Sequence, residues 1–318
     1  MVRILVTGAT GGIGRTLVPL LASRGLDVVA TGRNAGIGGT LAGGRVRFVP
    51  LDLARDDLAP LVAGSAIVIH LAARSSPWGS LASFRSDNVA ATARLLDAAA
   101  RAGAARFVHA STPAIFSERR HRLGLRSRSS PAARPMNAYA RTKLEAERLV
   151  MAERRMATIV LRPSAVLGPD DNAILPRLMR VLSRGILPVG NGGAALFHPT
   201  DVRDVAEAFA AAALGASPSG IANIAGREPV RIVEMAEALA DRLGIRLRVK
   251  QVPEPLLHAL ASAAELAGRA AGREPPLTRY SVSTLSWSRS FELDEAEALL
   301  GWRPGFGPWD SLAHAVPR

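Results

Sequence analysis

The sequence predicts an α/β fold, a doubly wound parallel sheet with helices on both faces and a smaller C-terminal cap. Three observations support this prediction. Apolar runs of strand length alternate with segments of helical periodicity along the N-terminal half. A glycine-rich turn follows the first apolar run. Beyond about residue 170 the alternation is lost and amphipathic helices dominate.

The chain opens with an apolar run from Val2 to Val6, which is typical of a strand buried on both faces. Gly8, Gly11 and Gly14 follow at three-residue spacing, before a helix predicted at 13–22. Glycine permits the backbone angles of a tight turn and the close approach of a bulky group. A pyrophosphate suits this position, because free N–H groups and the positive end of the helix dipole attract an anion. The alternative is a strand-to-helix turn without a ligand.

The same periodicities predict the remaining elements. Strands are predicted at 27–31, 45–50, 66–71, 106–110 and 157–161, with a glycine-rich surface loop at 35–44. Helices are predicted at 54–62, 84–102, 137–155, 172–184, 201–214, 229–243, 255–271 and 294–300. Short strands are predicted at 186–190, 194–198 and 220–224, and the last of them extends the sheet.

The composition indicates a globular protein of one or two domains, with 318 residues that are 48% hydrophobic. The chain has no cysteine, which excludes disulfides and thiolate metal sites, and we predict no metal site. The first strand starts at once, leaving no room for a signal peptide, and no apolar run reaches the ~18 residues of a membrane span. We therefore expect a soluble, cytoplasmic protein with no membrane span.

The net charge of +13 raises the question of nucleic-acid binding. However, Lys143 and Lys250 are the only lysines, the arginines are spread along the whole chain, and aromatic residues make up only 4%. Stacking platforms for bases are therefore missing, and a compositional arginine bias on solvated faces explains the charge better. We predict no nucleic-acid partner.

Tyr139 and Lys143 stand four residues apart at the start of a predicted helix, so that phenol and ammonium share one face. A nearby cation stabilises a phenolate and lowers the pKa of the phenol from about 10 toward working pH, as proton transfer requires. Alternatively, the pair is an exposed tyrosine beside a solvated lysine. Thr112 ends a strand at the carboxyl edge of the sheet, where its hydroxyl could hydrogen-bond a substrate oxygen or simply terminate the strand.

Together these residues resemble the extended short-chain dehydrogenase/reductase family, the NAD-dependent epimerase/dehydratase superfamily, over essentially the whole chain. The matching motifs are 7–14, Asp52-Leu53, 70–73, Asn88-Val89, Ser111-Thr112, Tyr139 with Lys143, Arg162-Pro163, 198–202 and 300–304. Pro77-Trp78-Gly79, 111–116 and 275–280 are most similar to its 3β-hydroxysteroid dehydrogenase-like branch, which includes bacterial reductases of β-keto acids.

The resemblance implies a Rossmann-type dinucleotide-binding domain at 1–171, completed by about 198–228, and a substrate-binding cap at 172–197 and 229–318. It implies that Tyr139 is the acid/base, that Lys143 binds the nicotinamide ribose and tunes Tyr139, and that Thr112 is the catalytic hydroxyl. Asn88 matches a residue whose role is more structural than chemical. The implied cofactor-binding residues are Gly8, Thr10, Gly11, Gly12, Ile13, Gly14, Arg33, Asp52, Leu53, Leu71, Ala72, Ala73, Tyr139, Lys143, Pro163, Ser164 and Val166.

Two departures from the family pattern bear on the ligands. The second strand ends in Gly32-Arg33, where an acidic residue would hydrogen-bond an adenosine 2′-hydroxyl. A guanidinium suits a 2′-phosphate, with Arg15 as a helper, so NADP(H) is predicted over NAD(H). The arginine-rich loop 118–135 is either a solvated face or a surface for an anionic substrate.

We expect an NADP(H)-dependent oxidoreductase that interconverts a secondary alcohol and a ketone, acting on a small-molecule substrate. One alternative is a nucleotide-sugar epimerase or dehydratase with retained NAD. Another is a non-catalytic NADP(H)-sensing protein. The resemblance also implies a homodimer, since dimers are common in the family.

Overall fold

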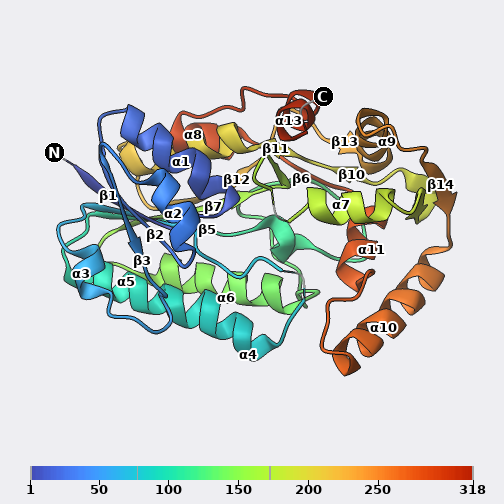
Figure 1. The fold of residues 1–318 in the computed structure, drawn as a ribbon, viewed down its shortest axis with the longest axis horizontal. Helices are drawn as coiled ribbons and strands as arrows, with labels where there is room; N and C mark the ends of the chain where they lie inside the picture. Colours follow the sequence, from blue (N-terminus) through green and yellow to red (C-terminus); the bar gives the residue numbers. More distant parts are fainter. Residues whose placement is uncertain (1, 77, 172, 317–318) are drawn as a thin grey trace.

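The structure is a computed structural model that describes residues 2–76, 78–171 and 173–316. Its centre is a seven-stranded sheet in which every neighbouring pair is parallel, in the order β12-β7-β5-β4-β1-β2-β3 (Figure 1). The strands are β1 (Arg3–Thr7), β2 (Asp27–Gly32), β3 (Val46–Pro50), β4 (Ile67–His70), β5 (Arg106–Ala110), β7 (Ala157–Pro163) and β12 (Gly220–Ile224). The predicted doubly wound sheet is confirmed. Its strand order reverses between β1 and β4, which places a crevice at their carboxyl ends.

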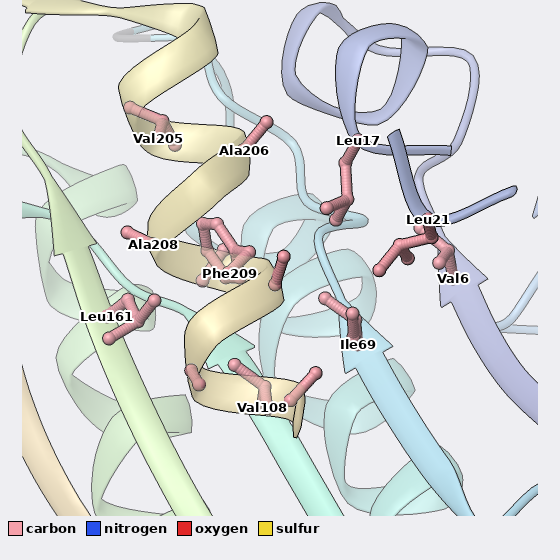
Figure 2. Packing of buried hydrophobic residues seen from close by; sticks show 14 of the residues in the cluster. Val6, Leu17, Leu21, Ile69, Val108, Leu161, Val205, Ala206, Ala208 and Phe209 are labelled. Carbon is pink, nitrogen blue, oxygen red and sulfur yellow. The ribbon is translucent and has the colours of Figure 1, made fainter. Parts of the chain in front are cut away.

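One face of the sheet is covered by α1 (Gly12–Ser23) and α8 (Val202–Leu214). Figure 2 shows Leu17 and Leu21 of α1 and Phe209 of α8 converging on strand residues such as Ile69. The alanines of α8 allow its backbone to approach the sheet closely. Fully burying a side chain such as Phe209 stabilises the fold by about 1.5–3 kcal/mol.

The other face is covered by α3 (Ala59–Val62), α5 (Ala91–Arg101) and α6 (Ala138–Ala152). The helix predicted at 84–102 runs through α4 (Leu81–Phe84), the π-helical segment η1 (Arg85–Ala90) and α5. Asn88 of η1 is buried, accepts a hydrogen bond from the Arg74 N–H at 2.7 Å, and donates to Thr142 at 3.2 Å. These contacts fit the structural role that the resemblance implied for Asn88.

The remaining elements form the smaller part of the molecule, toward the right of Figure 1. Its helices are α7 (Leu175–Leu182), α9 (Ile232–Arg242), α10 (Glu254–Ala270) and α11 (Arg279–Ser286). Its strand pairs are β9 (Ile186–Val189) with β14 (Arg248–Gln251) and β10 (Leu196–Phe197) with β13 (Val230–Arg231). At its base β8 (Val166–Leu167) pairs with β11 (Thr200–Asp201), and α13 (Pro308–Ala315) packs beside them. Residues of α12 (Asp294–Leu300), expected within the cap, pack in the core beside β12 and α8.

Three local predictions were wrong. The segment 35–44 is not a loop throughout, because α2 (Ala35–Leu41) forms where the Asn34 side chain accepts a hydrogen bond from the Ile37 N–H at 3.0 Å. The helix predicted at 54–62 is shortened to α3. The loop 118–135 contains β6 (Arg122–Leu125), which pairs with β15 (Arg289–Phe291), a partner that local pattern could not reveal. Pro77 and Asn172, which belong to a predicted motif and a predicted helix, lie outside the described residues.

Candidate active site

A cavity of about 810 Å³ lies between the carboxyl ends of the strands and the smaller part of the molecule. Thr112 and all seventeen residues of the predicted cofactor-binding set line it, so the structure brings every predicted site residue to one place. Their individual roles stay predictions. No group of three or more metal-ligating side chains is found among the described residues.

Two positions of the glycine turn have no room for a side chain, because the backbone packs closely around them. Gly8 has a φ of 69°, and a Cβ there would lie 2.6 Å from the Ala72 backbone nitrogen. A Cβ on Gly14 would lie 2.5 Å from the Gly8 carbonyl oxygen. No side chain caps the N-terminus of α1, so its first-turn N–H groups face the cavity as an anion site.

Arg33 lies just after β2, is exposed and lines the cavity. Within the described ranges, its guanidinium makes no hydrogen bond or ion pair. Arg15 behaves differently, because it forms an ion pair with Asp170 at 2.6 Å and is not part of the lining. The expectation that Arg15 assists Arg33 is therefore not supported by its contacts. Asp52 accepts a hydrogen bond from the Ala54 N–H at 3.0 Å, which fixes the turn after β3.

Tyr139 lies in the first turn of α6, whose start is fixed by the Asn137 side chain accepting a hydrogen bond from the Ala140 N–H at 2.8 Å. The Tyr139 phenol lies near Thr112, which follows β5 after Ser111 and is close enough to lower the pKa of the phenol. Phe84 packs beside the phenol with ring centroids 6.4 Å apart. The structure thus brings Thr112 and Tyr139 to one place, and their joint contact with a substrate oxygen stays a prediction.

The expectation that Lys143 makes the phenol unusually acidic was wrong. Burial raises the pKa of Tyr139 to about 12, the hydrogen bond with Thr112 lowers it only in part, and Tyr280 raises it further. Burial also lowers the pKa of Lys143 to about 7, although Glu147 opposes this. Lys143 is not among the groups that shift the pKa of Tyr139, so it does not offset the desolvation of the phenol.

The amine of Lys143 contacts the Nε2 atom of His109 at 3.2 Å, a partner that the sequence did not indicate. His109 is fully buried, and burial holds its pKa well below the usual range. Its Nδ1 atom has no hydrogen-bond partner among the described residues. His70 lies next to His109, with ring centroids 5.3 Å apart. The Nδ1 atom of His70 lies 2.7 Å from the Thr7 hydroxyl, and its Nε2 atom lies 2.9 Å from the Thr92 hydroxyl.

A buried ion pair holds the floor of the site together. Glu147, one turn after Lys143 on α6, accepts a hydrogen bond from the Arg162 Nε atom at 2.9 Å and from the Ser111 hydroxyl at 2.7 Å. Arg162 also donates to the Ser127 carbonyl at 2.8 Å and lies over the Phe116 ring. The pair therefore ties the ends of β5 and β7 to α6, giving the Arg162-Pro163 motif a structural function.

The chain was compared with models of known protein families. The model of the NAD dependent epimerase/dehydratase family matches residues 4–225. The chain belongs to this family. Its glycine turn and its Thr112, Tyr139 and Lys143 cluster lie within the matched residues.

Individual relatives cover nearly the whole chain. The uncharacterized protein YbjS of Escherichia coli is 33% identical over 314 residues, 95% of this chain and 93% of its own length. The 2-alkyl-3-oxoalkanoate reductase of Stenotrophomonas maltophilia is 32% identical over 317 residues, 95% of this chain and 94% of its own. A 3β-hydroxysteroid dehydrogenase/Δ5→4-isomerase of Mycobacterium tuberculosis is 27% identical over 333 residues, 99% of this chain and 90% of its own.

Among solved structures, MoeE5 in complex with UDP-glucuronic acid and NAD is similar, with a TM-score of 0.77 and 26% identity. The match covers 99% of this chain and 97% of MoeE5. The chain is therefore an extended short-chain dehydrogenase/reductase enzyme with a site for an NAD(P)-type dinucleotide. No helix in the described part of the chain is long and apolar enough to cross a membrane.

None of the arginines of the loop 118–135 lines the cavity, so the cavity gives no support to the substrate interpretation of this loop. Instead, several pair with acidic residues on the outside of the molecule. Arg119 pairs with Glu254 at 2.9 Å, and Arg128 pairs with Glu295 at 3.5 Å. Both are more than half exposed, with side-chain exposures of 56% and 76%, as the solvated-face interpretation expects.

Most lining residues beyond the sheet edge were missed by the sequence analysis. They are mainly apolar and come from the smaller part of the molecule: Leu175, Leu178, Val181, Leu187, Phe197, Met235, Leu277, Leu285 and Phe291. The same part also supplies polar lining residues: Arg177, Arg180, Glu274, Thr278, Tyr280, Ser281, Thr284 and Arg289. Of the lining residues named here, Leu277, Thr278 and Tyr280 belonged to the motif 275–280. Ala165 was also missed; it lies between the predicted Ser164 and Val166 with a φ of 38°, a strained angle for a residue with a Cβ.

Proposed function

We propose that the protein is an NADP(H)-dependent oxidoreductase that interconverts a secondary alcohol and a ketone. The observation that carries the proposal is that Tyr139 and Thr112 lie together in a cavity that runs from the glycine turn to a mainly apolar wall. The similarity to the reductase of Stenotrophomonas maltophilia supports this chemistry. We also propose a cytoplasmic location, with which the absence of cysteine is in keeping. A homodimer is proposed from the resemblance to the family.

The bound cofactor would supply or accept the hydride at the substrate carbon. Tyr139 would donate its proton to the substrate oxygen during reduction, and Thr112 would hold that oxygen in place. A phenol whose pKa is raised to about 12 keeps its proton until an alkoxide develops, which suits an acid in the reductive direction. Lys143 would hold the nicotinamide ribose, and Pro163, Ser164 and Val166 would lie along the nicotinamide.

The preference for NADP(H) is proposed from Arg33, whose guanidinium is exposed at the end of β2 and lines the cavity. A planar guanidinium forms charge-assisted hydrogen bonds with a phosphate, which a 2′-hydroxyl cannot match. Solved relatives such as MoeE5 contain NAD, so NAD(H) is the alternative cofactor.

A nucleotide-sugar epimerase is the second candidate, favoured by the similarity to MoeE5, whose structure contains UDP-glucuronic acid. Apolar lining residues such as Leu178, Met235 and Leu285 favour an aliphatic substrate over a sugar. The arginines of the same wall, Arg177, Arg180 and Arg289, are compatible with either candidate.

Cofactor consumption separates the two candidates. Incubation with NADPH and aliphatic ketones, followed at the nicotinamide absorbance, should show one NADPH oxidised for each alcohol formed. Interconversion of UDP-sugars without net NADPH or NADH consumption, together with no ketone reduction, would establish the epimerase instead.

A further inference from the structure

Arg289 is a lining residue of the cavity whose charge has no acidic partner in the structure. It lies on β15, and its guanidinium donates hydrogen bonds to the hydroxyls of Ser117 and of Thr284, the latter at 3.3 Å. No carboxylate of the described residues forms an ion pair with it. The other half-buried arginines of the lining do have such partners: Arg74 with Asp87 at 2.8 Å and Arg177 with Glu274 at 3.2 Å.

The two hydroxyls orient the guanidinium without neutralising it. The Thr284 hydroxyl donates its own proton to the Tyr280 carbonyl at 3.1 Å, so its oxygen offers a lone pair to Arg289. A guanidinium has five N–H donors, and two hydroxyls leave three of them for a ligand. The remaining fork matches a carboxylate geometrically.

The position of Arg289 is tied to the candidate catalytic pair through both of its partners. Ser117 ends the short 3-10 helix η2 (Pro113–Phe116) that directly follows Thr112. Thr284 lies one helical turn, about 5.4 Å along the axis, after Tyr280, which is close enough to raise the pKa of Tyr139.

The strand that carries Arg289 is itself fixed. The Phe291 N–H donates to the His198 Nδ1 atom at 3.3 Å, and the two rings stack with centroids 6.0 Å apart. Leu285, Leu277 and Leu178 line the same cavity and offer a surface for an aliphatic chain. An oriented cation beside apolar walls suits an amphipathic anion.

The name of the Stenotrophomonas maltophilia relative already points to an oxoalkanoate substrate. We propose that Arg289 is the residue that binds the carboxylate of such an aliphatic oxo acid or of its hydroxy acid. The proposal rests on the proposed function for the reacting ketone, but the carboxylate site itself can be tested without turnover. A neutral ketone of equal length would lack the bond to Arg289.

The test compares decanoate with decanamide, which share a chain and differ in charge, by titration calorimetry in the presence of NADP⁺. The unchanged protein should bind decanoate about 10–100-fold more tightly, the range expected for hydrogen bonds between charged groups. Arg289→Met should abolish this preference while leaving decanamide and NADP⁺ binding unchanged, which shows that the variant is folded. Arg289→Lys should keep part of the preference.

Arg180→Met is the matched control, because Arg180 lines the same cavity but is exposed. It should keep the full preference for decanoate. Equal binding of both probes by the unchanged protein, or an unchanged preference in Arg289→Met, would overturn the proposal. Coenzyme A binding that depends on Arg289 would also overturn it in favour of a phosphate site. A decanoate preference without any ketone reduction would refute the proposed function alone.

Discussion

The two walls of the cavity are built in different ways. The wall at the sheet edge consists largely of backbone, small residues and a few fixed polar groups, such as Gly8, Gly14 and Thr112. The opposite wall consists of large side chains from helices and strands that are far apart in the sequence, such as Leu178, Met235 and Leu285. A dinucleotide held by backbone N–H groups imposes fixed spacings on the sequence, whereas an apolar substrate surface requires only the right volume.

This difference separates what is common to the family from what is particular to this chain. The sheet-edge wall lies within the residues that the family model matches, 4–225. Much of the opposite wall, including Met235, Leu285 and Arg289, lies beyond them. Changes at the first wall should therefore affect cofactor binding or chemistry, and changes at the second should affect the choice of substrate.

Tyr139→Phe is the strongest test, because Tyr139 lies where the two walls meet. Loss of the hydroxyl should lower kcat by about 100- to 10,000-fold, because the substrate oxygen loses its proton donor. This range is the usual contribution of general acid catalysis. The dissociation constant of NADPH should stay within a few-fold of the original. Steady-state kinetics and a fluorescence titration of NADPH measure the two quantities.

Tyr280→Phe is the matched control, since Tyr280 is the only other tyrosine and also lines the cavity. It should change kcat far less than Tyr139→Phe. A larger loss in Tyr280→Phe would assign the acid to the opposite wall and reverse the proposed roles.

Gly14→Ala tests the backbone construction of the sheet-edge wall. Its Cβ would lie 2.5 Å from the Gly8 carbonyl oxygen, so the turn must move, at a cost of about 1–3 kcal/mol. We expect weaker NADPH binding and a lower free energy of unfolding, measured by calorimetry and urea denaturation. Gly39→Ala on the exposed part of α2 meets nothing within 4 Å and should instead be neutral or stabilising by about 0.4–1 kcal/mol. Equal NADPH affinity in both variants would contradict the inference that the glycine turn holds the cofactor.

The sheet-edge wall could be predicted from sequence because each of its parts is local. The glycine spacing follows an apolar strand, and Tyr139 and Lys143 are one helical turn apart. The sheet strands and most helices were predicted correctly for the same reason. The prediction of a loop at 35–44 was wrong because the glycines of α2 are typical of loops. In the structure, Gly38 is needed within the helix because it lies against the Phe48 ring, where a Cβ would not fit.

The remaining features depend on contacts between distant residues. The strand β6 exists because β15, far along the chain, pairs with it, and Arg289 enters the cavity from that pair. The pKa of Tyr139 likewise depends on how completely the surrounding segments exclude water, which spacing along the chain does not record. His109 was missed because nothing in its strand distinguishes a histidine facing Lys143 from an ordinary core residue.

Arg33→Ser tests which dinucleotide the sheet-edge wall selects. Removing the guanidinium should lower the ratio of kcat/KM for NADPH to that for NADH by about 10–100-fold, because charge-assisted hydrogen bonds to the 2′-phosphate are lost. Arg15→Ser should have little effect on this ratio, since Arg15 already pairs with Asp170. A higher kcat/KM for NADH than for NADPH in the unchanged protein would refute the NADP(H) assignment.

Lys143 should cause a slope in stability with pH, an effect on folding rather than on cofactor binding or catalysis. Burial lowers its pKa to about 7, whereas the unfolded chain keeps a value near 10.4. Between these values the unfolded state binds the additional proton, so the free energy of unfolding should rise with pH, by up to about 1.4 kcal/mol per pH unit. Urea denaturation from pH 7 to 9.5 should show this rise, and Lys143→Met should remove it. Lys250→Met, which changes an exposed lysine of β14, should keep it. The same slope in all three proteins would mean that the amine of Lys143 stays charged in the fold, which would restore its ability to acidify Tyr139.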